Sequence, residues 1–250
     1  MLVSVVVCTY DETRYDVFSA CVESVLGQTY EPLELVIVVD GNDDLYDRVR
    51  TDFGHADSVI DSAVIHNNDA NRGISYSRTR GAELASGEIV AFIDDDAVAE
   101  PGWLEALVAV YESTDAIAVG GDVRPDWVDE EPAFMPEEFY WLIGCVERDF
   151  AEDGEEVRNT YGSNISYRRE HFLAVGGYDP KTGRQGDRHI QAHEAPVGVR
   201  LLREFGQGMI YTDQAVVHHR MFSYRGDFSW LVKRAFMQGY SKRIFDVLYP

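Results

Sequence analysis

The sequence predicts an α/β fold in which helices cover both faces of a mostly parallel β-sheet. Three apolar runs in the first half of the chain, Leu2–Cys8, Leu33–Val39 and Glu88–Ile93, are rich in β-branched residues, as is typical of strands buried on both faces. Segments with helical periodicity separate these runs. This alternation predicts a sheet that collects its ligands at the carboxyl ends of the strands.

The remaining elements of the first half follow the same alternation. Apolar residues recur with helical period between residues 17 and 26, and a short strand is expected at Ala63–His66. A second helix is expected over Ser75–Ala85, closed by Gly87, and Pro101 opens a third. We therefore expect a Rossmann-like β-α-β arrangement over residues 1–122.

The second half of the chain is less regular. An acidic stretch rich in Pro and aromatic residues, Asp126–Trp141, predicts a long loop or short helices of the kind that form lids. Strands are expected at Tyr161–Tyr167 and Met209–Val217, and a helix at Glu194–Phe205. These patterns favour one catalytic domain over residues 1–220, with its irregular half at 123–220, followed by a segment at 221–250.

Composition and charge exclude several classes of protein. The 44 acidic and 22 basic residues give a net charge of −22, which repels nucleic acid. Such a surface suits either a chain that must stay hydrated in concentrated salt or an ordinary acidic cytosolic enzyme. The three cysteines have no metal-ligand spacing, and no apolar run is long enough to span a membrane. We expect a cytoplasmic protein without disulfides or zinc.

The C-terminal segment differs in charge from the rest of the chain. Residues 221–250 contain five basic and two acidic side chains, a net charge of +3, among many aromatic residues. A basic, aromatic segment on an acidic body is typical of contact with a membrane surface that bears lipid phosphates. The alternative is a C-terminal helix packed on the core.

Consecutive carboxylates, Asp94-Asp95-Asp96, directly follow the apolar strand that ends at Ile93. Carboxylates at the end of a strand can hold a hard divalent cation that bridges two phosphates. On composition alone these three acids fit equally well as part of a very acidic surface.

The order of four segments resembles glycosyltransferase family two, whose members have the GT-A fold. The segments are SVVVCTYDE at Ser4–Glu12, SVLGQTYEPLELVIVVDGNDD at Ser24–Asp44, NRGISYSRTRGAELASGEIVAFIDDDA at Asn71–Ala97 and GSNISYRREHFLAVGGYD at Gly162–Asp179. The resemblance implies an inverting transferase that uses a nucleotide-diphosphate sugar, expected to be UDP-linked, and Mn²⁺ or Mg²⁺. Within the family the chain resembles haloarchaeal transferases that assemble N-glycans of the S-layer on dolichyl phosphate.

The resemblance also implies roles for individual residues of the donor site. Thr9, Tyr10 and Glu12 would line the base and ribose, and Asp40 would accept a hydrogen bond from the base. Asp94 and Asp95 would fix the ribose or the metal shell, and the side chains expected around the diphosphate and its metal ion are Arg78, Asp96, His219 and Arg225. Among these, Asp96 would be the direct metal ligand, and His219, expected after the strand that ends at Val217, would complete the metal or diphosphate shell.

An inverting transfer needs a carboxylate that takes the proton of the acceptor hydroxyl. The family usually supplies this base from a Glu-Asp pair before a helix, and the matching place here has Glu194 followed by Ala195. Glu194 is therefore the candidate base. Asp187 and His193 are possible substitutes, and Glu194 fits a helix-capping role as well.

The resemblance favours a hexosyltransferase that extends a lipid-linked glycan of the dolichol phosphate type, with a hexose or hexuronic acid as the transferred sugar. Such an enzyme is expected to be peripheral on the cytoplasmic face of the cell membrane. Two alternatives are a soluble transferase that builds an exopolysaccharide and, because Ala195 stands where the family has an acid, a nucleotide-sugar-binding protein without catalysis.

Overall fold

A computed structural model describes residues 1–56, 60–181 and 194–248 of the chain. One nine-stranded sheet runs through these residues in the order β3-β2-β1-β4-β8-β6-β9-β5, and β7 pairs with β9 beside this path. The strands are β1 Val3–Thr9, β2 Leu33–Val39, β3 Ser62–Asn67, β4 Ile89–Asp94, β5 Ala97–Ala99, β6 Ala118–Trp127, β7 Glu156–Val157, β8 Ile165–Arg168 and β9 Met209–Met221. The α-helices are α1 Tyr15–Leu26, α2 Asp43–Phe53, α3 Ile74–Leu84, α4 Trp103–Ser113, α5 Arg169–Ala174, α6 Glu194–Phe205 and α7 Phe228–Leu248, with 3₁₀ turns η1 Glu12–Arg14, η3 Glu137–Leu142 and η4 Ser223–Gly226.

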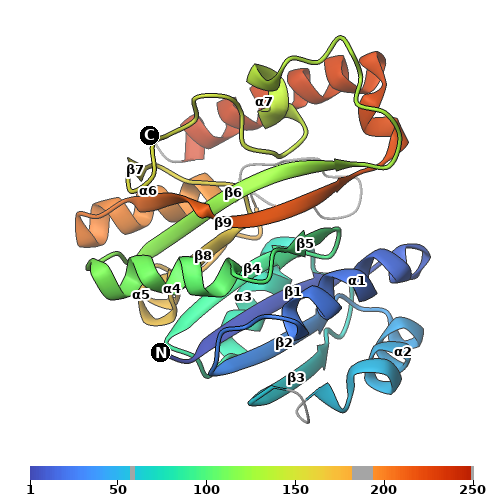
Figure 1. Ribbon diagram of the computed structural model, residues 1–250, viewed down its shortest axis with the longest axis vertical. Helices are drawn as coiled ribbons and strands as arrows, with labels where there is room; N and C mark the ends of the chain where they lie inside the picture. Colours follow the sequence, from blue (N-terminus) through green and yellow to red (C-terminus); the bar gives the residue numbers. More distant parts are fainter. Residues whose placement is uncertain (57–59, 182–193, 249–250) are drawn as a thin grey trace.

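The first four strands, β1 to β4, are mutually parallel and lie between two layers of helices (Figure 1), with β3 half-buried at the edge of the sheet. Successive side chains of a strand point to opposite faces, so Val5 and Val7 pack in the core under α1, α2 and α4. Val6 and Cys8 face the second core, under α3, α5 and α6. The predicted α/β fold with a mostly parallel sheet is confirmed, and the apolar runs are strands because both of their faces are covered.

The second half of the chain extends the same sheet and does not form a separate one. β8 pairs antiparallel with β4, and the long strands β6 and β9 run parallel to each other beside it. Asn164, fully buried just before β8, joins these strands to α4: its side-chain amide donates to Asp122 O at 2.7 Å and Ala215 O at 2.8 Å, and accepts from Trp103 Nε1 at 2.8 Å.

Several elements differ from the sequence expectation. α2, β5 and β6 were not expected, because α2 is mainly polar and the two strands are short or contain Gly and Pro. β8 begins only at Ile165, since Tyr161 and Asn164 form a turn. β9 continues to Met221, so His218 and His219 lie within this strand and not after it, because β5 and β6 pair with its last residues.

The C-terminal segment forms the long helix α7, which follows η4 and lies against η3. Its Leu231 is buried with Met135, Leu142 and Met221 in a third apolar cluster. None of the helices described in the structure combines the length and apolar character needed to cross a membrane. The acidic stretch Asp126–Trp141 contains the end of β6 and most of η3, in agreement with the predicted short helices.

Replacing Asn164 by Ala should lower the free energy of unfolding by about 3 kcal/mol, because the indole N–H of Trp103 and two buried carbonyls lose their partner. Urea unfolding followed by circular dichroism measures the change. The control is Gln214→Ala, an exposed amide on the same sheet, which should cost less than about 0.5 kcal/mol. Equal losses in the two variants would contradict the structural role of Asn164.

Candidate active site

A cavity of about 1200 Å³ opens at the carboxyl ends of β1, β2 and β4. Its opposite wall comes from the second half of the chain, including η3, the start of α6, the end of β9 and one face of α7. The predicted site residues that line it are Thr9, Tyr10, Asp40, Arg78, Asp94, Asp95, Asp96, Glu194, His219 and Arg225. Glu12 is the exception: it is exposed in η1 and does not line the cavity, because η1 turns its side chain to solvent.

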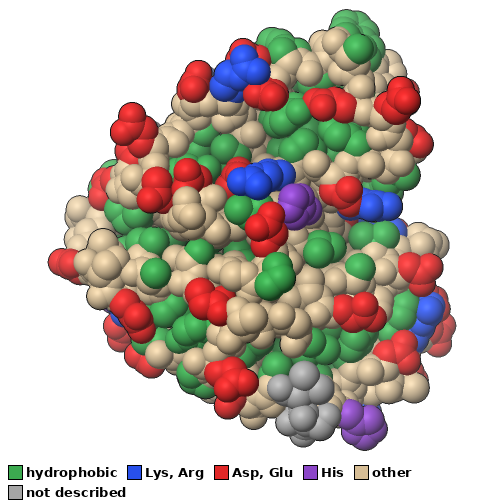
Figure 2. Space-filling view, in the orientation of Figure 1, with side chains coloured by type: hydrophobic (Ala, Val, Ile, Leu, Met, Phe, Trp, Pro, Cys, Tyr) green, Lys and Arg blue, Asp and Glu red, His purple; other side chains and the backbone are tan. Residues whose placement is uncertain are grey.

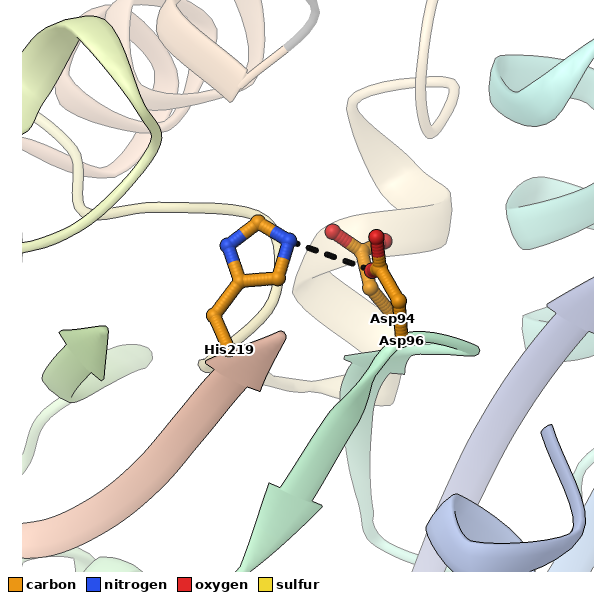
Figure 3. A group of neighbouring side chains, drawn as sticks. All are labelled: Asp94, Asp96 and His219. Carbon is orange, nitrogen blue, oxygen red and sulfur yellow. Dashed lines mark hydrogen bonds and ion pairs between the residues drawn. The ribbon is translucent and has the colours of Figure 1, made fainter. Parts of the chain in front are cut away.

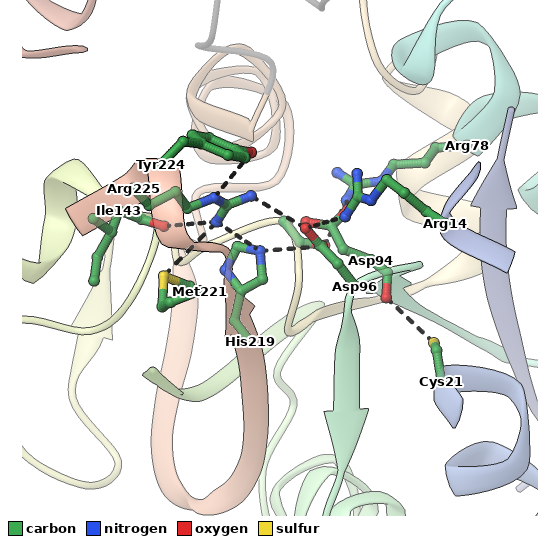
Figure 4. Close-up of polar contacts among 11 residues, drawn as sticks. Arg14, Cys21, Arg78, Asp94, Asp96, Ile143, His219, Met221, Tyr224 and Arg225 are labelled. Atoms are coloured by element: carbon green, nitrogen blue, oxygen red, sulfur yellow. Dashed lines mark hydrogen bonds and ion pairs between the residues drawn. The ribbon is translucent and has the colours of Figure 1, made fainter. Parts of the chain in front are cut away.

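Asp96 is the centre of a buried ion-pair network. Its Oδ2 accepts from Arg14 Nη2 at 2.6 Å and from Arg225 Nη2 at 3.1 Å, and its Oδ1 lies 3.1 Å from His219 Nε2. Figure 4 shows these groups reaching the aspartates from opposite sides of the cavity. Asp96, in the turn between β4 and β5, thus links Arg14 in the loop after β1 to His219 at the end of β9.

Burial and neighbouring charges change the pKa values of Asp95 and Asp96. Burial by itself raises the pKa of Asp96, but the neighbouring His219, Arg225 and Arg14 hold that pKa below its ordinary value. For Asp95, desolvation and then the negative charge of Asp96 raise the pKa to about 7. Asp96 is therefore the carboxylate that stays ionised, which is the form that binds a cation.

Asp94, Asp96 and His219 offer ligand atoms that all lie within 4.8 Å of one another. Figure 3 shows the His219 ring at the end of β9 directed at both carboxylates. His219 Nε2 lies near two groups with opposite requirements: the Asp96 carboxylate can only accept a hydrogen bond, and Arg225 Nη1, at 3.2 Å, can only donate one. Because Nε2 either donates or accepts, no single tautomer of His219 satisfies both groups. The buried Nδ1 has no hydrogen-bond partner among the described residues. This donor set of two carboxylates and one imidazole fits a divalent cation.

Arg78, Gly162 and Glu194 form the next part of the wall. The buried Arg78 donates through Nη2 to Asp94 Oδ1 at 2.5 Å and to Gly162 O at 2.8 Å. The N–H of Gly162 donates to Glu194 Oε1 at 3.1 Å. A Cβ on Gly162 would lie 2.4 Å from Arg78 Nη1 and 2.5 Å from Glu194 Oε1, so only glycine allows this close approach. Glu194 is thus linked through Gly162 and Arg78 to Asp94, one of the three residues that could hold a cation.

Asp40 organises the turn that precedes α3. Its carboxylate accepts from Asn68 Nδ2 and from the backbone N–H groups of Arg72 and Gly73 at 2.7 to 2.9 Å. Gly73 has a φ of 86°, which suits glycine at the start of α3. Oδ2 receives only one of these bonds, so it has capacity left for a further donor. The exposed Tyr10 ring lies at the same end of the cavity.

Sequence reasoning missed two parts of the cavity wall. Arg14 lies closer to Asp96 than His219 or Arg225 does, although only its place in the loop after β1 could have pointed to it. The cavity-facing side of α7 was expected to touch a membrane or the core, not the site. The substitutes for the base, Asp187 and His193, lie outside the described residues.

Comparison with solved structures defines the class of protein. A mannosyltransferase of Pyrobaculum calidifontis in complex with GDP-Man and Mn²⁺ superposes with a TM-score of 0.67 at 20% identity, covering 97% of this chain and 64% of that one. GalNAc-T7 with UDP, GalNAc and Mn²⁺ gives a TM-score of 0.66 at 16% identity, covering 94% and 48%. The fold is therefore that of the GT-A glycosyltransferases.

Sequence comparison places the chain within that class. The family model described as glycosyl transferase family 2 matches residues 4–176. The chain is 64% identical to the glucosyl-dolichyl phosphate glucuronosyltransferase of Haloferax volcanii over 251 residues, which cover all of this chain and 79% of that protein. This chain belongs to glycosyltransferase family 2 and is a glycosyltransferase, as the ordered motifs predicted.

The two adjacent histidines of β9 provide a matched test of the cation cluster. His219→Ala should weaken Mn²⁺ binding at least about tenfold, because it removes one of three ligands. His218→Ala should leave binding unchanged, because His218 pairs with Glu100 and does not line the cavity. Calorimetric titration of the protein with MnCl₂ measures both. Equal affinities in the two variants would remove His219 from the cluster.

Proposed function

We propose that this protein is a metal-dependent inverting transferase that moves glucuronic acid from UDP-glucuronate to a glucose carried on dolichyl phosphate. The observation that carries the proposal is the geometry of one cavity, in which a cation-binding cluster and a fixed carboxylate, Glu194, are joined through Arg78. The identity of 64% to a protein named for this reaction supports the choice of sugar and acceptor. The product would extend a lipid-linked glycan used in cell-surface N-glycosylation.

The donor diphosphate would be held where positive charge is concentrated. A divalent cation, Mn²⁺ or Mg²⁺, bound by Asp94, Asp96 and His219 would supply charge neutralisation of the two phosphates. Arg14 and Arg225 are already beside that position and can donate to phosphate oxygens. Asp40, at the end of β2, has an acceptor free to take an N–H of the base. Thr9, Tyr10 and Asp95 complete the nucleoside and ribose side of the cavity.

Glu194 would act as the base. As the acceptor oxygen forms its bond to the anomeric carbon, the hydroxyl proton passes to the Glu194 carboxylate. The bond from the anomeric carbon to the diphosphate oxygen breaks on the opposite face, and Arg14 and Arg225 stabilise the charge that develops on the leaving group. The Gly162 N–H and Arg78 hold Glu194 in place for this transfer.

The outer face of α7 would contact the membrane that contains the acceptor. Phe228 and Phe236 are 70% and 74% exposed, and three further apolar residues lie exposed along the same side: Val232, Tyr240 and Val247. Elsewhere the surface is strongly acidic, as Figure 2 shows for one face. An apolar, positively charged helix on such a body would attach it peripherally to the cytoplasmic face of an anionic membrane.

The reaction is tested by incubating the protein and MnCl₂ with radiolabelled UDP-glucuronate or UDP-glucose and with glucosyl dolichyl phosphate. Transfer of the uronic acid only, abolished by EDTA and by Asp96→Ala, is the expected result. A parent protein that binds the donor without transferring it would favour a catalytically inactive binding protein. Transfer to a water-soluble glycan in preference to the lipid would favour an exopolysaccharide enzyme.

Glu194→Gln should lower turnover by about two to four orders of magnitude while the affinity for donor and cation stays near the parental value, because only the proton acceptor is lost. Steady-state kinetics and a calorimetric titration with UDP measure the two quantities. If Glu194 merely caps α6, the variant would instead lose thermal stability and keep its turnover per folded molecule.

Phe236→Ser should weaken binding to vesicles of mixed anionic and zwitterionic phospholipid by about tenfold, because one inserted aromatic side chain is lost. Leu202→Ser, which removes a half-exposed apolar side chain from α6, is the control and should bind as the parent does. Co-sedimentation with vesicles measures both. If the two variants bind alike, the outer face of α7 is not the membrane contact.

A further inference from the structure

α7 presents a second, chemically different face to the cavity. The residues of α7 that line the cavity are Trp230, Arg234, Gln238, Lys242, Phe245 and Asp246. The first four are spaced four residues apart, so they form one stripe along the helix. Because the exposed aromatic residues occupy the other side, α7 separates the outer surface from the substrate cavity along much of its length.

The stripe places positive charge away from the cation cluster. Arg234 Nε donates to Leu142 O at 2.9 Å, and its guanidinium lies 6.0 Å from the Trp230 ring centroid. The Lys242 ammonium lies 5.3 Å from the Trp141 ring centroid. Lys242 forms no ion pair with any carboxylate in the described part of the chain. Arg14, Arg225 and Arg78, by contrast, each form an ion pair with Asp96 or Asp94.

Lys242 is exposed, and Lys233 of the same helix also has no ion pair within the described residues, so what distinguishes Lys242 is its place on the cavity wall. Two basic side chains on one wall, Arg234 and Lys242, favour an anionic ligand there, although Asp246 lines the same wall. The two indole rings beside the two basic side chains offer apolar surface next to the charge. Phosphate joined to a hydrocarbon or a sugar combines the two kinds of group that this wall would bind.

We infer that the cavity face of α7 is the binding site for the phosphate of the lipid-linked acceptor, with Lys242 and Arg234 as its donors. This inference rests on the proposed function and assigns the acceptor half of the site. The phosphodiester is bound by α7 and the donor diphosphate by the cation cluster, so the two anions occupy separate walls. The lipid chain leaves toward Trp141 and Trp230, and the terminal sugar points toward Glu194.

The position of α7 explains how a membrane lipid reaches the cavity. A phosphate at the surface of a bilayer lies at the level of a helix that rests in the headgroup region. With Phe236 on the outer side and Arg234 on the inner side, α7 can contact lipid and phosphate at once. The acceptor therefore need not leave the membrane for its sugar to enter the site.

Lys242→Gln tests the inference against Lys233→Gln, which makes the same change on the same helix at an exposed residue that does not line the cavity. Two soluble acceptors are compared: glucose on a short isoprenyl phosphate, and octyl glucoside, which lacks phosphate. Lys242→Gln should raise KM for the phosphate acceptor about tenfold or more and leave KM for octyl glucoside and for the donor unchanged. Lys233→Gln should match the parent on both acceptors.

A binding measurement keeps this test independent of turnover. Quenching of tryptophan fluorescence by the short isoprenyl phosphate itself, with isoprenol as the uncharged control, reports on the wall that contains Trp141 and Trp230. The parent should bind the phosphate at least about tenfold more tightly than the alcohol, and Lys242→Gln should lose that difference. Free inorganic phosphate should not compete at equal concentration, which distinguishes a lipid phosphate from phosphate alone.

The outcomes separate the two proposals. A parent protein that transfers sugar to neither acceptor but binds isoprenyl phosphate through Lys242 overturns the proposed reaction and keeps the phosphate site. A parent that transfers sugar while Lys242→Gln and Lys233→Gln have equal acceptor KM and equal phosphate affinity overturns the inference. Arg234→Gln should repeat the effect of Lys242→Gln, and its thermal unfolding is compared because Arg234 also bonds to Leu142.

Discussion

The charge of Asp96 is the constraint on which the rest of the cavity depends. Its carboxylate is buried at the end of the parallel strands, where an uncompensated charge costs several kcal/mol. Arg14 from the loop after β1 and Arg225 from the far end of the chain supply the opposite charge, and His219 Nε2 lies 3.1 Å from the same carboxylate. The length of β9, the short strand β5 and the turn η4 together bring these three side chains to one carboxylate.

That arrangement also bears on how an acidic protein would accept the anionic donor of the proposed reaction. Seven carboxylates line the cavity, and six Lys and Arg side chains lie among them: Arg14, Arg78, Arg158, Arg225, Arg234 and Lys242. Long-range repulsion from the acidic surface is screened by salt, but interactions inside a partly buried cavity are screened much less. The position of each basic side chain inside the cavity therefore matters more for an anionic ligand than the net charge of −22 does.

Rigidity around Glu194 comes from backbone groups and not from a second acid. The Gly162 N–H holds its carboxylate, and the absence of a side chain on Gly162 lets Arg78 approach the same point. The carboxylate is thus oriented although Ala195 follows it in the sequence. In the proposed reaction, a single glutamate held in this way would perform the proton transfer that the family usually assigns to a Glu-Asp pair.

The sequence by itself determined the parallel half of the fold, the family and the polar centre of the cavity, although it singled out only a minority of the residues that line the cavity. Apolar runs and helical periods are local patterns, and the polar residues that follow three parallel strands necessarily meet at one edge. β5 and β6 had no such pattern, and their pairing with β9 is what places His219 opposite Asp96.

Only the tertiary structure decided which distant residues meet. The partners of Asp96 lie 82, 123 and 129 positions away along the chain. The helical and strand periodicities of neighbouring residues cannot predict such a pairing. Arg14 and the inner face of α7 were missed for this reason. The charge of the C-terminal segment was visible in its composition, but a helix has two sides, and packing against η3 and η4 determined which basic residues face the cavity and which face the surface.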